Sequence, residues 1–322
     1  MRLVLYGLSA YRFWIRAVER PCAGALSDER VLEDAAPPTR AIAYLRDELP
    51  EVATPLHLLC ARDSQRPEPG VIVHRSCRRY PRGSFLKVRS GIYAPCPELT
   101  AAQLAGSYRG PLLARAVSLL MGASALAPGE RYDRLPRPVL ATRRSMAAYL
   151  TKEPGLPGAA AVSELLPYLV EGTASPAETD LALALCLPGR LGGWRLEQPL
   201  ANHRVALSPT ARRIAGQDAV KVDLFWPERG LVVEYDSDLT HLTPEQHARD
   251  ASRRAALESD GYKVITVTTE HLYGPRSLDP IADEAARVLG IRRRARPAGF
   301  RERQRALQGL PRGYDLPDDL FA

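Results

Sequence analysis

The segment KVDLFWPERGLVVEYD, residues 221–236, places acidic side chains inside two apolar runs. The turn-forming residues PERG at 227–230 separate the runs and indicate a β-hairpin. If Trp226 pairs with Leu231 across the turn, Asp223 lies opposite Glu234. Like charges directly opposite each other destabilise a sheet, so we expect a compensating group. A hard divalent cation held by carboxylates would provide it.

The same pairing places a second pair on this face of the hairpin. Lys221 lies opposite Asp236, and the period of two along a strand directs both to the side that carries the opposed acids. The other face is apolar apart from a tyrosine hydroxyl, and it is formed by Val222, Leu224, Val233 and Tyr235.

Composition indicates an ordinary globular protein. The chain has 322 residues, enough for two domains, with 45% hydrophobic and 25% charged residues. No apolar run is long enough to span a bilayer, and residues 1–10 are too short for a signal peptide. We therefore expect a cytoplasmic protein without membrane contact. Five dispersed cysteines without a CxxC pair indicate reduced thiols rather than a metal site.

The charge balance is basic. The formal net charge is +7, and only four of the 44 basic residues are lysines. Arginine suits phosphate binding through its planar fork of donors, so the excess indicates a polyanionic partner. A GC-rich genome, whose codons favour arginine, is the alternative explanation.

Periodicity and breakers divide the chain into four parts. Residues 1–108 read as an α+β domain with strands near 3–5, 55–59, 71–74 and 84–88. Residues 109–172 read as a helical connector, with an apolar helix over 110–126 and a breaker at 153–158. Residues 291–322 form a basic C-terminal tail, for which solvation and nucleic-acid contact both stay open.

Residues 173–290 have the clearest element signals. Ser175, Pro176 and Glu178 start a helix, with the serine as N-cap. Short strands at 196–200 and 205–207 precede the hairpin, and a helix ends near Ser259. A strand at 262–268 and a helix at 279–290 follow. We predict an α/β fold here, a mixed sheet flanked by helices.

This region resembles the PD-(D/E)XK nuclease superfamily. It is most similar to the branch related to very-short-patch-repair endonucleases, and this branch is often found at the C-terminus of actinobacterial proteins. The matching stretches are SPAE at 175–178, VDLFWPERGLVVEYD at 222–236 and HARDASRRAALESDGYKVITVT at 247–268. The resemblance implies a restriction-endonuclease-like fold, Mg²⁺ as cofactor with Mn²⁺ as substitute, and hydrolysis of DNA phosphodiesters.

The resemblance also assigns roles to individual residues. Asp223 and Glu234 match the metal-binding acids of the two hairpin strands. Glu178 matches the helix carboxylate that holds metal-bound water, although it would equally serve as a capping-box acid. A lysine usually follows two residues after the second acid, and here that position is Asp236. Asp236 then reads as a further metal ligand or as a residue at the strand end.

The missing ammonium group has two candidate replacements. Lys221 shares the predicted face with the acids, and Lys263 belongs to the later strand. His241 or His247 could act as general acid or base, as histidines do in the repair endonucleases, or could lie idle on the surface.

Two sets of arginines are candidates for phosphate contact. Arg249, Arg253 and Arg254 are spaced to share roughly one helix face, which either contacts DNA or is solvated and paired with Asp250. The second set comes from the basic tail and consists of Arg292, Arg293 and Arg294.

The N-terminal half resembles the middle region of abortive-infection antitoxin-like regulators. The matching stretches are VHR at 73–75, SFLKVRSGIY at 84–93 and PEL at 97–99. Besides a non-nuclease interaction protein that keeps the fold for assembly, two functions remain open. One is a metal-dependent DNA endonuclease in phage defence or DNA repair, in which the N-terminal domain selects the target and a homodimer cuts both strands. The other is a degenerate nuclease fold that acts as a DNA-binding, antitoxin-like transcriptional regulator.

Overall fold

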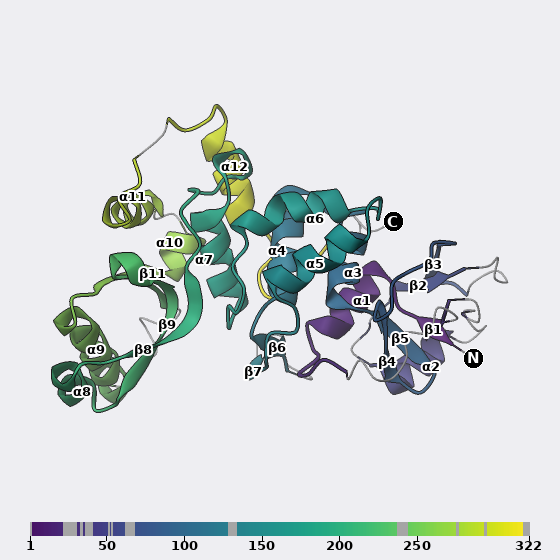
Figure 1. Ribbon diagram of the computed structural model, residues 1–322, viewed down its shortest axis with the longest axis horizontal. Helices are drawn as coiled ribbons and strands as arrows, with labels where there is room; N and C mark the ends of the chain where they lie inside the picture. Colours follow the sequence, from purple (N-terminus) through teal and green to yellow (C-terminus); the bar gives the residue numbers. More distant parts are fainter. Residues whose placement is uncertain are drawn as a thin grey trace. The chain divides into compact units, whose positions relative to one another are not determined.

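The computed structural model contains two compact units (Figure 1). The first comprises Met1–Pro167 with Gly313–Ala322, and the second comprises Tyr168–Arg312. The described residues are 2–21, 31–32, 35, 41–50, 52, 54–61, 68–127, 134–236, 244–274, 277–292 and 295–317.

The first unit combines short strands with helices. In chain order its elements are β1 (Leu3–Val4), α1 (Gly7–Trp14), α2 (Ala41–Glu48), β2 (Leu56–Cys60), β3 (Val71–Arg75), β4 (Phe85–Arg89), β5 (Ile92–Pro95), α3 (Pro97–Leu104), α4 (Gly110–Leu120), β6 (Ser124–Leu126), β7 (Arg134–Pro136), α5 (Arg143–Lys152) and α6 (Ala159–Leu165). One sheet has the order β1-β5-β4, while β2 pairs with β3 and β6 with β7. The α+β character predicted for this half agrees with these elements.

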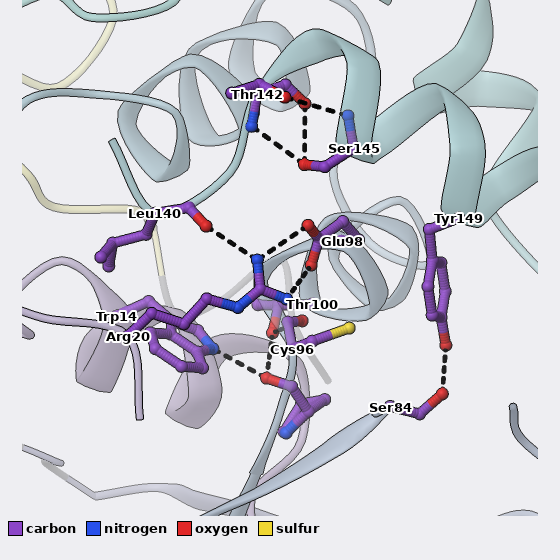
Figure 2. Close-up of polar contacts among 11 residues, drawn as sticks. Trp14, Arg20, Ser84, Cys96, Glu98, Thr100, Leu140, Thr142, Ser145 and Tyr149 are labelled. Carbon is purple, nitrogen blue, oxygen red and sulfur yellow. Dashed lines mark hydrogen bonds and ion pairs between the residues drawn. The ribbon is translucent and has the colours of Figure 1, made fainter. Parts of the chain in front are cut away.

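Buried and partly buried polar contacts tie the start of the first unit to its middle (Figure 2). The Trp14 indole Nε1 donates to the carbonyl of Pro95 at 2.8 Å. The guanidinium of Arg20 donates to both carboxylate oxygens of Glu98, at 3.1 and 3.0 Å, and to the carbonyl of Leu140 at 2.8 Å. Such two-pronged pairing fixes orientation as well as distance, so it holds the segment after α1 against α3.

The second unit is built on one four-stranded sheet. In chain order its elements are α7 (Pro176–Cys186), β8 (Leu200–Ala206), α8 (Pro209–Ala215), β9 (Ala219–Trp226), β10 (Leu231–Asp236), α9 (Pro244–Ser259), β11 (Lys263–Thr268), α10 (Thr269–Leu272), α11 (Asp279–Val288) and α12 (Phe300–Gln308). The strand order is β11-β10-β9-β8, with β11 parallel to β10 and the other pairs antiparallel. The mixed α/β fold predicted for this region is confirmed.

The hairpin of β9 and β10 has the predicted pairing. Trp226 pairs with Leu231, and the paired residues continue to Leu224 with Val233. Gly230 closes the turn with a φ of 58°, a left-handed conformation that glycine adopts without a Cβ clash. The turn therefore fixes which residues of the two strands face each other.

The helices α8 and α9 lie beside this sheet (Figure 1), and both contribute to one apolar cluster with it. Ala256 and Leu257 of α9 are fully buried and belong to one cluster with Val222, Phe225 and Val232 of the hairpin. This packing presents the polar residues one turn earlier on α9 to the same sheet. None of the helices in the described residues has the length and apolar character needed to cross a membrane.

The boundaries differ from the sequence-based division. Residues 109–167 belong to the first unit rather than forming a connector, and 291–312 belong to the second unit. The expected basic tail contains α12, whose Phe300 is buried and meets Trp194 edge to face at 5.9 Å. The sequence-based division missed this packing because residues 291–312 contain few apolar residues among many arginines. The two short strands expected near 200 are one strand, β8.

Gly158 offers a stability test of the first unit. It begins α6 with a φ of 84°, and a Cβ there would lie 2.1 Å from the carbonyl oxygen of Ala102. We expect Gly158→Ala to lower the free energy of unfolding by about 3 kcal/mol, measured by urea denaturation. Gly155→Ala is the matched control, since its φ is 80° but no atom lies within 4 Å of the added Cβ. Its cost should be about 1 kcal/mol, and equal costs would contradict the packing argument.

Candidate active site

Asp223 lies where the β9–β10 ladder ends. The paired residues stop at Leu224 and Val233, so Asp223 and Glu234 are not bridged by the regular strand ladder. Instead the backbone N–H of Tyr235 donates to Asp223 Oδ2 at 2.8 Å. The two acids are therefore not a regular cross-strand pair as predicted. The Asp223 carboxylate takes the place of a backbone carbonyl as the acceptor between the strands.

Glu178 reaches the same region from α7. Ser175 caps this helix by accepting the backbone N–H of Glu178 at 3.0 Å. Glu178 Oε2 accepts the backbone N–H of Ala174 at 2.8 Å and Asn202 Nδ2 at 2.7 Å. Glu178 therefore binds the N–H of the residue before the N-cap, so the capping box considered for it is not formed, and its other carboxylate oxygen remains available.

Asn202 is a site residue that the sequence analysis missed. The β8–β9 register places it level with Asp223, between the pairs Ala201–Leu224 and His203–Val222. Its φ of 52° is a left-handed conformation, which asparagine tolerates better than most residues. The available signal was the asparagine itself, a residue depleted in strands, within the apolar and basic segment LANHRVA.

Arg253 connects α9 to the acids. Its guanidinium lies 3.5 Å from Glu234 Oε1 and 3.3 Å from Asp250 Oδ1. It also donates to the carbonyl of Lys221 at 2.8 Å, beyond the end of the paired ladder. Arg254 donates to Thr266 Oγ1 on β11. The pairing with Asp250 considered for this helix face is present, together with contacts to the site.

Burial and neighbouring charges shift the protonation of Asp223 and Glu234. The pKa of Asp223 is raised to about 7, first by burial and next by the Glu178 carboxylate, with Glu234 adding to the rise. The Tyr235 N–H and the Arg253 guanidinium oppose this shift. Burial also raises the pKa of Glu234, again opposed by Arg253. A carboxyl group with a pKa near 7 marks a candidate functional site.

Each of the three acids has one oxygen left for a further partner. Asp223 Oδ2, Glu178 Oε2 and Glu234 Oε1 carry the contacts given above. Within the described residues, the remaining oxygen of each carboxylate carries no hydrogen bond or ion pair. Carboxylate oxygens are the ligands that Mg²⁺ and Mn²⁺ prefer, so the chemistry of this donor set fits a hard cation.

The ligand atoms are not gathered around a cation position. No group of three or more His, Cys, Asp or Glu side chains in the described part of the chain is arranged to hold a metal ion. This includes the predicted set of Asp223, Glu234 and Asp236. Asp236 is half-buried at the end of β10, level with Thr268 of β11, and its charge adds to the raised pKa of Glu234.

The two candidate lysines lie at different ends of the sheet. Lys221 is exposed, two residues before Asp223 on the same strand face. Lys263 pairs with Leu231 at the other end of β11, and its Nζ lies 3.7 Å from Glu284 Oε1. Lys263 is therefore remote from Glu234, whereas Lys221 stays near the acids.

Several predicted residues give no side-chain evidence. His241, Arg293 and Arg294 lie outside the described residues, and His247 is described only as part of the α9 backbone. Arg249 and Arg292 are exposed. The acids and Arg253 are thus brought together, while the roles of the histidines and of the former tail arginines stay predictions.

Two cations stand directly opposite each other beside the acids. Arg204 of β8 pairs in register with Lys221 of β9, and both side chains are exposed. Like charges at directly opposed positions destabilise a sheet. Within the described residues no acidic side chain pairs with either one, so an external anion would relieve this repulsion.

Comparison with known proteins yields relatives without an assigned activity. No family model and no solved structure matches the chain. Two proteins of Mycobacterium tuberculosis are similar to it, the uncharacterised proteins MT2308 of strain CDC 1551 / Oshkosh and Rv2248 of strain ATCC 25618 / H37Rv. Each is 27% identical over 244 residues, or 76% of this chain and 76% of the relative. This aligned length exceeds either compact unit, so the likeness includes residues of both.

The raised pKa of Asp223 predicts a pH-dependent stability in metal-free buffer. Its folded pKa of about 7 exceeds the unfolded value of about 3.9, so the native protein binds more protons between these limits and stability falls as pH rises through them. We expect Asp223→Asn to raise the free energy of unfolding by roughly 1–3 kcal/mol at pH 8, with little effect at pH 4.

Urea unfolding of the full chain at both pH values measures this difference. Asp218→Asn is the control, because Asp218 precedes the same strand and its side chain is 85% exposed. A pH-independent effect of Asp223→Asn, or an equal gain from the control, would contradict the assigned electrostatics.

Proposed function

We propose that this protein is a metal-dependent DNA endonuclease that hydrolyses phosphodiester bonds. The observation that carries the proposal is the set of Glu178, Asp223 and Glu234, three carboxylates from different elements, each with one oxygen left for a cation. The stretches that resemble the PD-(D/E)XK superfamily include these same residues. We extend the proposal to a role in phage defence or DNA repair, with the first unit selecting the target.

Different residues of the chain would bind the metal and orient its ligands. Glu178, Asp223 and Glu234 would hold Mg²⁺, with Mn²⁺ as substitute. When bound, the metal supplies a hydroxide nucleophile near neutral pH and neutralises charge that develops on the phosphate. Asn202 orients Glu178, and the Tyr235 N–H orients Asp223.

Arg253 is our candidate for the positive charge that the usual lysine provides. Its guanidinium already lies 3.5 Å from Glu234, so it stands beside the proposed reaction centre. Arginine remains protonated throughout the relevant pH range, so it would stabilise negative charge rather than transfer protons. Asp236, which occupies the usual lysine position, would then act through its negative charge, which raises the pKa of Glu234.

DNA is the proposed partner because of the cations next to the acids. Arg204 and Lys221 would contact one backbone phosphate each, and exposed Arg249 would extend the basic surface along α9. Cutting both strands of a duplex would require two centres, so we propose a homodimer on DNA. We also propose a cytoplasmic location, which suits Cys60, Cys77, Cys96 and Cys186 because none of them forms a disulfide.

Removal of either hairpin acid tests the catalytic proposal. We expect Asp223→Ala and Glu234→Ala each to lower plasmid nicking in Mg²⁺ or Mn²⁺ by at least about 100-fold, since each loses a proposed metal ligand. Glu228→Ala is the control, because Glu228 is an exposed acid in the turn between the same strands. Nicking that survives both acid substitutions would exclude this centre.

The opposed cations also favour a second candidate function, a DNA-binding regulator without catalysis. DNA binding by Arg204 and Lys221 would not require metal. We expect the double variant Arg204→Gln/Lys221→Gln to reduce the slope of log Kd against log salt by up to about 2, measured by fluorescence anisotropy.

Arg287→Gln is the control for this binding test, since Arg287 on α11 is exposed and already paired with Glu284 at 2.7 Å. An unchanged salt slope in the double variant would remove the proposed phosphate contacts. Salt-sensitive binding that depends on Arg204 and Lys221, without metal-dependent nicking, would favour the regulator over the nuclease.

A further inference from the structure

A cavity of about 480 Å³ lies in the second unit, and none of the three carboxylates of the candidate active site borders it. It is bordered by residues 188–190 and 193–197 after α7, by the end of α11 and by the start of α12. Tyr168, Trp194 and Phe300 contribute aromatic side chains to its lining. The volume falls within the range found for small-molecule sites.

Backbone contacts hold the wall of the cavity that contains Arg195. Three successive N–H groups, those of residues 194–196, donate to carbonyl groups at the C-terminal end of α7 at distances of 2.9–3.0 Å. Gly193 packs so closely beside them that a Cβ there would lie 2.3 Å from the carbonyl oxygen of Leu187. The Arg195 side chain is therefore not needed to hold this wall in place.

Arg195 has a strained backbone. Its φ of 58° is a left-handed conformation, which costs free energy in any residue with a Cβ. Glycine adopts such a conformation readily, as Gly192 does three residues earlier with a φ of 90°. Among the described residues, the other non-glycine residue with a positive φ is Asn202, which contacts Glu178 in the candidate active site. Strain of this kind concentrates at functional sites, so the arginine at 195 calls for a role.

Two guanidinium groups on the lining are available to a ligand. Arg195 and Arg292 are exposed, and neither side chain has a hydrogen bond or ion pair in the part of the chain that the structure describes. Arg296, on the same lining, already pairs with Asp279 at 3.1 Å and stacks on the Trp194 ring at 4.4 Å. The described lining contains four arginines and one glutamate, so its charge is positive and complementary to an anion.

Tyr168 supplies an aromatic ring without a partner of its own. The side chain is half-buried, and within the described residues its ring has no ring contact and its hydroxyl no hydrogen bond. The Trp194 and Phe300 rings, by contrast, meet each other edge to face. A free ring beside free cations is the combination that binds single-stranded nucleic acid, in which a base stacks on the ring while the backbone phosphates contact the cations.

We propose that this cavity binds an unpaired nucleotide of the DNA partner. Its base stacks on Tyr168, and the phosphates on either side of it bind Arg195 and Arg292. The inference rests on the proposed function and names its substrate class, DNA that contains an unpaired stretch. A fully paired duplex keeps its bases stacked inside the helix and offers the cavity no base.

Fluorescence anisotropy of the full chain in metal-free buffer tests this preference. The probes are a labelled duplex of about 20 base pairs and the same duplex with a short central stretch of mismatches. Both carry the same number of phosphates, so they differ in base pairing and not in charge. We expect the mismatched duplex to bind about fivefold more tightly or better, because one stacked base contributes that much.

Variants of Tyr168 test the stacking. Tyr168→Leu keeps an apolar side chain without an aromatic ring, so the preference for the mismatched duplex should disappear. Tyr168→Phe keeps the ring and should retain the preference. A preference that persists in Tyr168→Leu would overturn the proposal.

Variants of the two arginines test the phosphate contacts. Arg195→Gly and Arg292→Gln should each weaken binding of the mismatched duplex by about threefold or more. Arg195→Gly also removes the backbone strain, so the variant should unfold at no lower temperature than the wild type while binding DNA less tightly. Arg305→Gln is the matched control, because Arg305 is exposed, lies outside this cavity and has no side-chain partner among the described residues.

The outcomes separate this inference from the proposed function. If the wild type binds neither duplex, the proposed DNA partner fails together with the cavity. If both duplexes bind equally and binding still depends on Arg204 and Lys221, the cavity proposal alone is wrong. Unchanged affinity in both arginine variants, or an equal loss in Arg305→Gln, would likewise contradict it.

Discussion

The second unit depends on the contacts that stabilise three neighbouring buried carboxylates. Glu178, Asp223 and Glu234 would repel one another where burial weakens the screening by water. The Ala174 N–H and the Asn202 side-chain amide bind Glu178, the Tyr235 N–H binds Asp223, and the Arg253 guanidinium lies against Glu234. These contacts reduce the free-energy cost of burying the three carboxylates. The regular pairing of β9 and β10 ends before Asp223, and the Asp223 carboxylate accepts the Tyr235 N–H there. Within the described residues, this arrangement leaves one oxygen of each carboxylate without a contact, and our functional proposal follows from these oxygens.

Local signals predicted the elements that carry these acids. The residues at 227–230 form a turn that fixes the pairing of Trp226 with Leu231, so alternation then places every hairpin side chain. Ser175 and Glu178 likewise mark the start of α7 by satisfying backbone donors at a helix end. Both signals lie within a few residues of the element they define, and sequence reasoning works at that range.

The contacts that complete the site come from distant parts of the chain. Asn202 reaches Glu178 across 24 positions, and Arg253 reaches Lys221 across 32. No local pattern encodes such distances, because they follow from the sheet order and from the packing of α9. The membership of residues 291–312 in the second unit was missed for a related reason. Phe300 and Leu307 are the buried apolar residues of α12, and they are too weak a signal to outweigh the surrounding arginines.

The most direct measurement is a calorimetric titration of the full chain with Mn²⁺ at pH 6 and pH 8, in two buffers of different ionisation enthalpy. Asp223 must lose its proton to bind metal, so the account predicts tighter binding at pH 8 and release of about one proton per metal ion at pH 6. Binding should be lost in Asp223→Ala. Absence of Mn²⁺ binding to the wild type, or equal affinity at both pH values without proton release, would contradict the central claim.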